Sequence, residues 1–188
     1  MKRNPAERII LGIDPGTTIT GYGVIKTDGR DPQLITIGAI DLSKIGDHYL
    51  KIKYIFERTV GIIDEFHPDE LAIEAPFYGK NVQSMLKLGR AQGAAIAAAL
   101  TRSLPIFEYA PRKIKMSITG RGAASKEQVA SMLMKILKFG DMKLKLDATD
   151  GLAAALCHFY QTASPVSEKS YNSWKEFMNK NPKRVKKQ

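Results

Sequence analysis

The pattern of apolar residues predicts three strands at the start of the chain. Residues 9–14, Ile-Ile-Leu-Gly-Ile-Asp, form an apolar run that ends at Pro-Gly, which is typical of a strand buried on both faces. Residues 21–27 and 33–41 predict the second and third strands, because the turn sequence at 28–32 separates them. These strands should form an antiparallel meander.

Beyond residue 41 the apolar spacing changes. Residues 47–66 place apolar side chains at the 3.6-residue period of a helix that packs one stripe on the sheet. Residues 71–75 predict a short buried strand, which Pro76 closes because proline cannot extend a central ladder. A long helix over 81–103 and a fifth strand over 106–110 follow.

The rest of the chain predicts further helices. Pro111 suits the first position of one helix, where its missing N–H costs nothing, and Ser125 is the expected N-cap of a helix over 126–138. The last core helix should run over 147–161. Because strand-helix-strand units require parallel crossovers, the order of elements predicts an α/β fold in which helices cover both faces of a mixed five-stranded sheet.

The second half of the helix over 81–103 consists largely of small residues. Small side chains let another helix approach closely. This stretch suits either packing within the chain or an interface between subunits, and the sequence leaves both open.

Composition indicates one soluble folded domain. Of the 188 residues, 44% are hydrophobic and 26% are charged. We assign residues 1–163 to this domain and 164–188 to a basic tail that is poorly ordered at its end. No segment approaches the ~18 to 20 apolar residues of a membrane span, and no signal-peptide pattern opens the chain, so we expect a cytoplasmic protein. The single cysteine, Cys157, fits a reducing compartment and a place in the core.

The net charge of +10 favours a polyanionic partner. Residues 164–188 hold seven Lys or Arg against two Glu, and the rest of the excess lies in the body of the chain. Each cation that neutralises a phosphate releases counterions, so a basic surface attracts nucleic acid. Charge that serves general solubility is the alternative.

Four acidic residues lie where core packing does not require them. Asp14 ends the first strand, Glu74 interrupts an apolar strand, and Asp147 and Asp150 are three residues apart, which places them on one side of a helix. Three of the four have ordinary explanations: Asp14 as a turn former, Asp147 as an N-cap and Asp150 as a complement to the helix dipole. Glu74 has none.

If the first and fourth strands are neighbours, Asp14 and Glu74 approach each other at the end of the sheet. Like charges in a partly dry site repel, and a divalent cation would relieve that repulsion. Carboxylates without cysteine or clustered histidine favour Mg²⁺ or Mn²⁺ over Zn²⁺. Two such ions would activate a water and stabilise the leaving oxygen of a phosphodiester.

Three sequence blocks carry a family resemblance. They are Ile-Leu-Gly-Ile-Asp-Pro-Gly with Thr-Gly-Tyr-Gly-Val-Ile, then Ala-Ile-Glu-Ala-Pro-Phe-Tyr-Gly-Lys-Asn with Leu-Lys-Leu-Gly-Arg-Ala-Gln-Gly, and Asp-Ala-Thr-Asp-Gly-Leu-Ala-Ala-Ala. Over Arg8 to Thr162, in this order, they resemble the bacterial RuvC family of crossover junction endonucleases. The resemblance implies an RNase H-like fold, a homodimer, and Mg²⁺-dependent paired nicking of four-way Holliday junctions in homologous recombination and DNA repair. It also implies the branch-migration proteins RuvA and RuvB as partners.

The resemblance assigns roles by position. The four acids match the metal ligands of the family, with two ions per subunit and Mn²⁺ as a substitute for Mg²⁺. Lys115 and Lys126 match lysines near the scissile phosphate, and Phe77 matches an aromatic residue placed against junction bases. The other expected DNA contacts are Tyr78, Lys80, Arg112 and Lys113. The alternatives are a Phe77 side chain folded onto the body and lysines that are simply solvated.

Three other functions compete with this interpretation. Residues 14–18 resemble the phosphate loop of actin-like ATPases and sugar kinases, although those proteins need two such domains and this chain supplies one. The chain would otherwise be a module that binds branched DNA without cutting it, or an RNase H-like nuclease that acts on RNA. The C-terminal segment matches nothing in the family pattern, and nonspecific DNA affinity is its first candidate role.

Overall fold

The computed structural model describes residues 7–76, 81–140 and 146–163. Its elements, in chain order, are β1 (Arg8–Asp14), β2 (Ile19–Thr27), β3 (Pro32–Asp41), α1 (His48–Phe66), β4 (Glu70–Glu74), α2 (Val82–Leu100), β5 (Ile106–Tyr109), α3 (Pro111–Thr119), α4 (Lys126–Leu137) and α5 (Leu146–Ala163). The predicted order of strands and helices is confirmed. The predicted tail, residues 164–188, lies outside the described residues.

The sheet has the strand order β3-β2-β1-β4-β5. β1 pairs antiparallel with β2 and parallel with β4, so the meander and the parallel crossovers are both confirmed. β1 is the central strand, and this explains its apolar sequence, because Ile10, Leu11 and Ile13 are fully buried.

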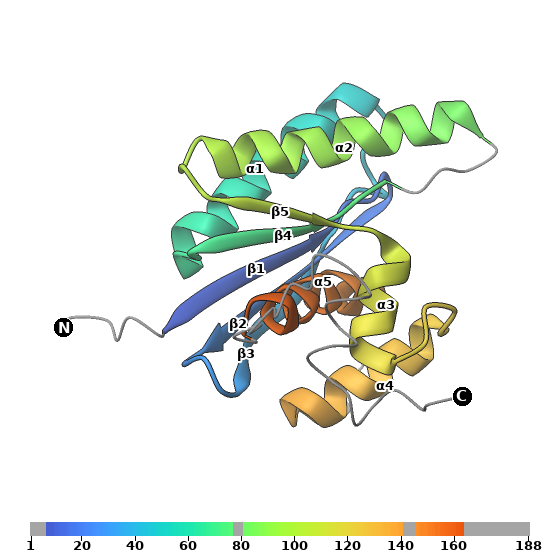
Figure 1. Cartoon of the computed structure of the whole chain (residues 1–188). Helices are drawn as coiled ribbons and strands as arrows, with labels where there is room; N and C mark the ends of the chain where they lie inside the picture. The colour runs from blue at the N-terminus through green and yellow to red at the C-terminus, as the bar shows by residue number, and fades with distance from the viewer. Residues whose placement is uncertain (1–6, 77–80, 141–145, 164–188) are drawn as a thin grey trace, which may run out of the picture.

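Helices cover both faces of the sheet, as predicted (Figure 1). On one face α1 and α2 pack through a core that includes Leu11, Ile13 and Ile55. On the other face α3, α4 and α5 pack against Ile10 and Ile25. α5 contacts all four of β1, β2, β3 and β4, so it is the helix that spans the sheet.

The small residues of α2 serve packing within the chain. Ala91, Ala94, Ala95, Ala98 and Ala99 are buried, and α2 packs along α1. The helix ends at Leu100, earlier than predicted, because residues 101–103 form a turn in which Ser103 has a φ of 55°. The alternative of packing within the chain therefore accounts for the alanines, and the exposed face of α2 is a separate surface.

Polar side chains cap the start of α1 and of α4, and the cap of α4 is the predicted one. Asp47 accepts a hydrogen bond from the N–H of Leu50 at the start of α1. At the start of α4 the Ser125 and Gln128 side chains each bond the other residue's backbone N–H, a capping box that confirms Ser125 as the N-cap. This cap fixes Lys126 as the first residue of α4.

Cys157 lies in the core, as expected, and is fully buried on α5. Within the described ranges, no helix has the length and apolar content needed to cross a bilayer.

Candidate active site

The carboxyl ends of β1 and β4 bring the first two acids together. In this parallel pair Ile13 is the partner of Ile73, and the next residues along the two strands are Asp14 and Glu74. Both lie where the chain leaves the sheet. The predicted approach of these two carboxylates is therefore observed, and it follows directly from the strand register.

Glycines bring α5 onto the same edge of the sheet. A Cβ atom on Gly21 would lie 1.9 Å from the carbonyl oxygen of Asp147, and one on Gly12 would lie 2.1 Å from the carbonyl oxygen of Gly151. Backbone meets backbone here, and any side chain would push the helix away. The sequence held a signal for this contact that the predictions above did not use, because glycine inside a strand indicates close approach of another backbone.

The first turn of α5 carries the other two acids. The helix begins at Leu146, so Asp147 lies inside the first turn. The alternative that Asp147 is the N-cap is therefore wrong, because the helix starts one residue earlier than predicted. Asp150 is three residues further on, and both side chains reach the same cation, which confirms that they share one side of the helix.

That cation is Lys126. Its Nζ atom lies 2.6 Å from Oδ2 of Asp150 and 3.3 Å from Oδ1 of Asp147. Burial alone would lower the pKa of Lys126, but the hydrogen bond to Asp150 and the charges of both aspartates outweigh it and raise the pKa. The lysine is therefore charged, and it neutralises part of the acid cluster.

Asp14 and Glu74 carry strongly raised pKa values. Burial raises the pKa of Asp14 to about 7, the charge of Asp150 adds to the rise, and Lys126 opposes it. Burial likewise raises the pKa of Glu74, to about 8, and the charges of Asp14 and Asp150 make smaller contributions to the rise. Burial also raises the pKa of Asp150 more than its hydrogen bond from Lys126 lowers it. These carboxylates are too close and too dry to ionise together at neutral pH without more positive charge.

A cleft of about 560 Å³ opens beside these acids. Asp14, Glu74 and Asp150 line it together with Lys115 and Lys126. The predicted catalytic lysines thus share one cleft with three of the four predicted acids, and the fourth is tied to it through Lys126.

The predicted DNA contacts divide into three groups. Arg112 lines the cleft. Lys113 instead places its Nζ atom 5.2 Å from the centre of the Tyr109 ring. Phe77, Tyr78 and Lys80 lie outside the described residues.

Gln92 is a polar side chain at this edge that the sequence analysis missed. It is buried on α2, and its Nε2 atom donates to the carbonyl oxygen of Glu74 at 3.4 Å and to Glu108 at 3.2 Å. It fixes the end of β4, and with it the position of Glu74. A glutamine among alanines on a buried helix face was the available signal.

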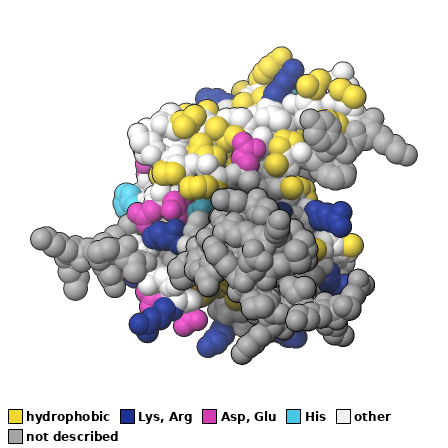
Figure 2. Space-filling model, in the orientation of Figure 1, with side chains coloured by type: hydrophobic (Ala, Val, Ile, Leu, Met, Phe, Trp, Pro, Cys, Tyr) yellow, Lys and Arg dark blue, Asp and Glu magenta, His cyan; other side chains and the backbone are white. Residues whose placement is uncertain are grey.

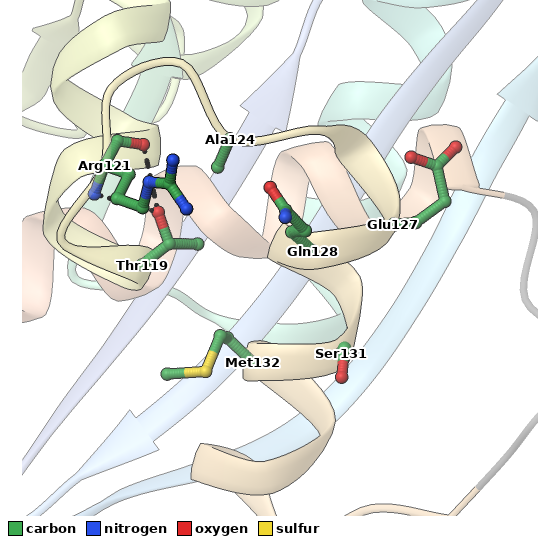
Figure 3. Close-up of a pocket in the computed structure, with 7 residues that line it drawn as sticks. All are labelled: Thr119, Arg121, Ala124, Glu127, Gln128, Ser131 and Met132. Atoms are coloured by element: carbon green, nitrogen blue, oxygen red, sulfur yellow. Dashed lines mark hydrogen bonds between the residues drawn. The ribbon is translucent and has the colours of Figure 1, made fainter.

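A second hollow, of about 400 Å³, is lined by the α3–α4 turn and by α4 (Figure 3). Thr119 and Arg121 lie at its α3 end, where the Arg121 N–H donates to Thr119 Oγ1 at 3.1 Å. Gln128 and Met132 line it along α4. Among the described residues Glu127 is its one acidic lining residue, and it shares no lining residue with the cleft formed by Asp14, Glu74 and Asp150, so the two hollows are distinct.

The acids suit a hard divalent cation in their chemistry. All the donors are carboxylate oxygens, which is the set that Mg²⁺ and Mn²⁺ prefer. Among the described side chains, however, no three His, Cys, Asp or Glu surround a single point as they stand. Asp147 and Asp150 hold the ammonium group of Lys126 instead. The residues fit the ion in type, and a lysine cation stands at two of them.

The chain resembles known proteins over almost its full length. The family model described as crossover junction endodeoxyribonuclease RuvC matches residues 10–158. The protein of that name from Bacteroides fragilis is 65% identical over 182 residues, which are 96% of this chain and 97% of that protein. The corresponding protein from Porphyromonas gingivalis is 57% identical over an alignment of 187 positions, which covers 97% of this chain and 99% of that protein.

Solved structures of junction-resolving enzymes have the same fold as this chain. The structure titled T. thermophilus RuvC in complex with Holliday junction substrate superposes with a TM-score of 0.75 at 31% identity, over 82% of this chain and 94% of that one. The yeast mitochondrial Holliday junction resolvase Ydc2 shares the fold, with a TM-score of 0.58 at 14% identity. Sequence, fold and the convergence of the acids therefore agree, and the chain belongs to the RuvC family of crossover junction endodeoxyribonucleases.

Proposed function

We propose that this chain resolves four-way Holliday junctions by paired symmetric nicks, with Mg²⁺, during homologous recombination and DNA repair. One observation carries the proposal: acids from β1, β4 and α5 share a single cleft edge with Lys115 and Lys126. The solved relative that superposes best among those described above holds a Holliday junction. Family membership favours DNA over RNA and argues against the ATPase alternative.

We assign Asp14, Glu74, Asp147 and Asp150 as the residues that hold two Mg²⁺ ions, with Mn²⁺ as a substitute. Bound ions would supply polarisation of the phosphodiester and neutralisation of its charge. The protein supplies the rest: the four carboxylates set the place of the reaction, and Lys115 and Lys126 offer positive charge to the phosphate in the cleft. The expected products carry 5′-phosphate and 3′-hydroxyl ends.

The wider DNA contacts rest on charge and position. Arg112 lines the cleft, and we assign Lys113, Phe77, Tyr78 and Lys80 as further DNA contacts on the family pattern. We assign residues 1–163 to the nuclease domain and 164–188 to a basic tail that adds phosphate contacts. Action in the bacterial cytoplasm, together with RuvA and RuvB, completes the proposal.

A homodimer fits the exposed face of α2. Val82, Leu86 and Leu100 are more than half exposed. Together with Gly89 and Gly93 they follow one another at spacings of four, three, four and seven residues, which places them on the side of the helix opposite its buried alanines. Hydrophobic side chains gather over this part of the molecule (Figure 2). Because cutting two symmetric strands requires two active sites, we propose that a second copy of the chain covers this face.

The decisive experiment is cleavage of a synthetic four-way DNA junction, with linear duplex and structured RNA as competitors, with and without Mg²⁺. Asp14→Asn and Glu74→Gln should reduce nicking at least ~10³-fold, since each removes a proposed ligand, while junction binding is retained because charge repulsion toward phosphate falls. Glu65→Gln, on the exposed side of α1, is the matched control and should cut normally. Near-normal nicking by either site variant would refute the assignment.

The dimer has its own test. Leu86→Glu should shift the chain to monomers in sedimentation at micromolar concentration, because it buries a charge in the proposed interface. Leu50→Glu, an equally exposed apolar position on α1, is the control. Monomers in the unchanged chain, with junction absent and present, would remove the dimer.

A further inference from the structure

The contacts of Lys126 differ from those expected of a lysine that waits for a phosphate. Its Nζ atom is bonded within the protein to Asp150 and Asp147, two of the proposed metal ligands. Its position is fixed from behind by the capping box at the start of α4. An ammonium group therefore stands between carboxylates that the proposed function reserves for divalent ions.

We propose that Lys126 is a built-in counter-ion that competes with the divalent cation for Asp147 and Asp150 and is released when DNA phosphate enters the cleft. This inference rests on the proposed function, and it adds a regulatory step to that site: metal loading depends on DNA.

The exposure of the three side chains permits the exchange. The side chain of Lys126 is 49% exposed, and that of Asp147 is 43% exposed, so the pair faces the solvent. Asp150, at 15%, is the inner partner. A lysine has four rotatable side-chain bonds, and Lys126 lines the cleft beside Lys115 and Arg112. Rotation about these bonds moves the ammonium group from the acids toward the cleft that Lys126 itself lines.

Lys115 provides the contrast. It lines the same cleft, and its charge opposes the rise that burial causes in the pKa values of Glu74 and Asp150. Within the described part of the chain, however, its ammonium group makes no ion pair with these acids within 4 Å. Of the two lysines, one is engaged by the acid cluster and the other faces the cleft without such a bond.

The energetic consequence follows from linkage. A divalent cation that binds the free protein must break the bonds between Lys126 and the two aspartates, so its affinity is reduced. Phosphate gives the displaced ammonium group a new partner, so DNA raises the affinity for the cation, and by reciprocity the cation raises the affinity for DNA. The site therefore fills with metal chiefly where substrate is present.

The first measurement is the affinity of the full chain for Mn²⁺ without DNA, determined by titration calorimetry. Lys126→Met removes the charge and keeps the aliphatic side chain, and it should bind Mn²⁺ about tenfold more tightly than the unchanged chain, within the usual range of couplings between sites. Lys126→Arg keeps the charge and should bind as weakly as the unchanged chain. Lys115→Met removes an equal charge from the same cleft and should change the affinity by no more than about threefold.

The second measurement is the gain in junction affinity on adding Ca²⁺, an oxygen-seeking divalent ion. The unchanged chain should gain several-fold more than Lys126→Met, because only the unchanged chain has an ammonium group to transfer. Lys126→Met should also cut more slowly despite its tighter metal binding, by about 10²-fold, since it loses charge near the phosphate.

The outcomes separate the two proposals. If no variant binds Mn²⁺ at all, the metal site and the proposed function both fail. If Mn²⁺ binds equally well to the unchanged chain and to Lys126→Met, the counter-ion role fails and the proposed function stands. Equal tightening by Lys115→Met and Lys126→Met, or tight binding by Lys126→Arg, would also overturn the counter-ion role, because it would show a general field or a steric effect.

Discussion

The two ends of the unit formed by β1, β4 and α5 treat charge in opposite ways. At the end where β1 and β4 begin, Arg8, Glu70 and His158 are joined in one bonded network. At the end where the same strands finish, Asp14 and Glu74 lie together with the acids of α5. Among the described residues these three elements thus carry charged or polar groups at both ends, but they supply opposite charges to one another only at the end with Arg8, and the cation at the other end, Lys126, comes from α4.

The matched end satisfies each polar group. Nη1 of Arg8 donates to both oxygens of Glu70 at 3.2 Å. Nε2 of His158 lies 2.9 Å from Glu70 Oε2, and its Nδ1 lies 2.7 Å from the hydroxyl of Tyr109. Burial lowers the pKa of His158 more than Glu70 raises it, so the ring is neutral and can donate from Nε2 and accept at Nδ1.

The unmatched end lacks this balance. Burial raises the pKa values of Asp14 and Glu74, and Lys126 is shared by two other acids. Where an end of the fold serves only stability, its buried charges are paired. Where like charges remain together, the arrangement costs stability, and that cost identifies the functional end.

The largest expected effect breaks the matched end. Glu70→Ala leaves Arg8 without its acid and the buried His158 without a bond at Nε2, so the free energy of unfolding should fall by about 3 kcal/mol. Urea unfolding measures this change. Nicking per folded molecule should stay unchanged, because Glu70 lies at the other end of β4 from Glu74. A variant that unfolds at the same urea concentration would contradict the role of the network.

The next effect displaces the unmatched end. Gly21→Ala forces a methyl group against the carbonyl oxygen of Asp147, so we expect about 2 kcal/mol of destabilisation and about 10²-fold slower nicking from misplaced acids. Thermal unfolding and the junction assay measure both. Gly61→Ala, on α1 with open space around it, is the matched control and should stabilise the helix by about 0.5 kcal/mol. Normal nicking by Gly21→Ala would show that α5 tolerates a shift.

A stability effect of similar size has the opposite sign. The pKa of Asp14 is raised from 3.8 to about 7 in the folded chain, so the folded state loses stability as pH rises through this range. Asparagine does not ionise, so in EDTA Asp14→Asn should be more stable than the unchanged chain by about 2 kcal/mol at pH 8, and the difference should shrink with each step toward pH 5. Asp64→Asn, at an exposed position on α1, should show no such gain. A gain independent of pH would show that repulsion is not its cause.

The smallest effect comes from the ion itself. Mg²⁺ at ten times its Kd should stabilise the unchanged chain by about 1.4 kcal/mol at pH 8, a rise in Tm of about 3 °C, because it binds the folded acids only. Calorimetric scans with Mg²⁺ and with EDTA measure this. Asp14→Asn should gain less, because a ligand is missing. Equal gains in both chains would place the ion elsewhere.

The sequence predicted the elements of the site and left out its packing. The strand over 9–14, the anomalous Glu74, and the spacing of Asp147 and Asp150 each carry a local signal, and the structure confirms how they converge. The contact between Gly21 and the backbone of Asp147, and the bonds of Lys126, join residues more than twenty apart in the chain. Periodicity indicates only which side of an element is buried, so it could not predict contacts between particular residues of different elements.

The matched end escaped prediction for a related reason. His158 lies in an apolar helix where a histidine has no distinctive neighbours in sequence. Glu70 precedes the strand predicted over 71–75, in which Glu74 is the more conspicuous acid, although in the structure Glu70 is the first residue of β4. Their pairing exists only once α5 lies across the sheet. For Asp147 the sequence instead suggested a local role that the structure does not show. Its position suggested an N-cap, but the helix begins one residue earlier, at Leu146.

The single cysteine of the chain offers a way to measure how often α5 separates from the sheet. Cys157 has no exposed surface, and its helix rests backbone to backbone on the central strands. An alkylating reagent can reach the sulfur only while the helix is lifted away, so the rate of labelling under native conditions reports how often the acids of α5 leave their partners. A single mass-spectrometric time course would follow this undocking without any engineered probe.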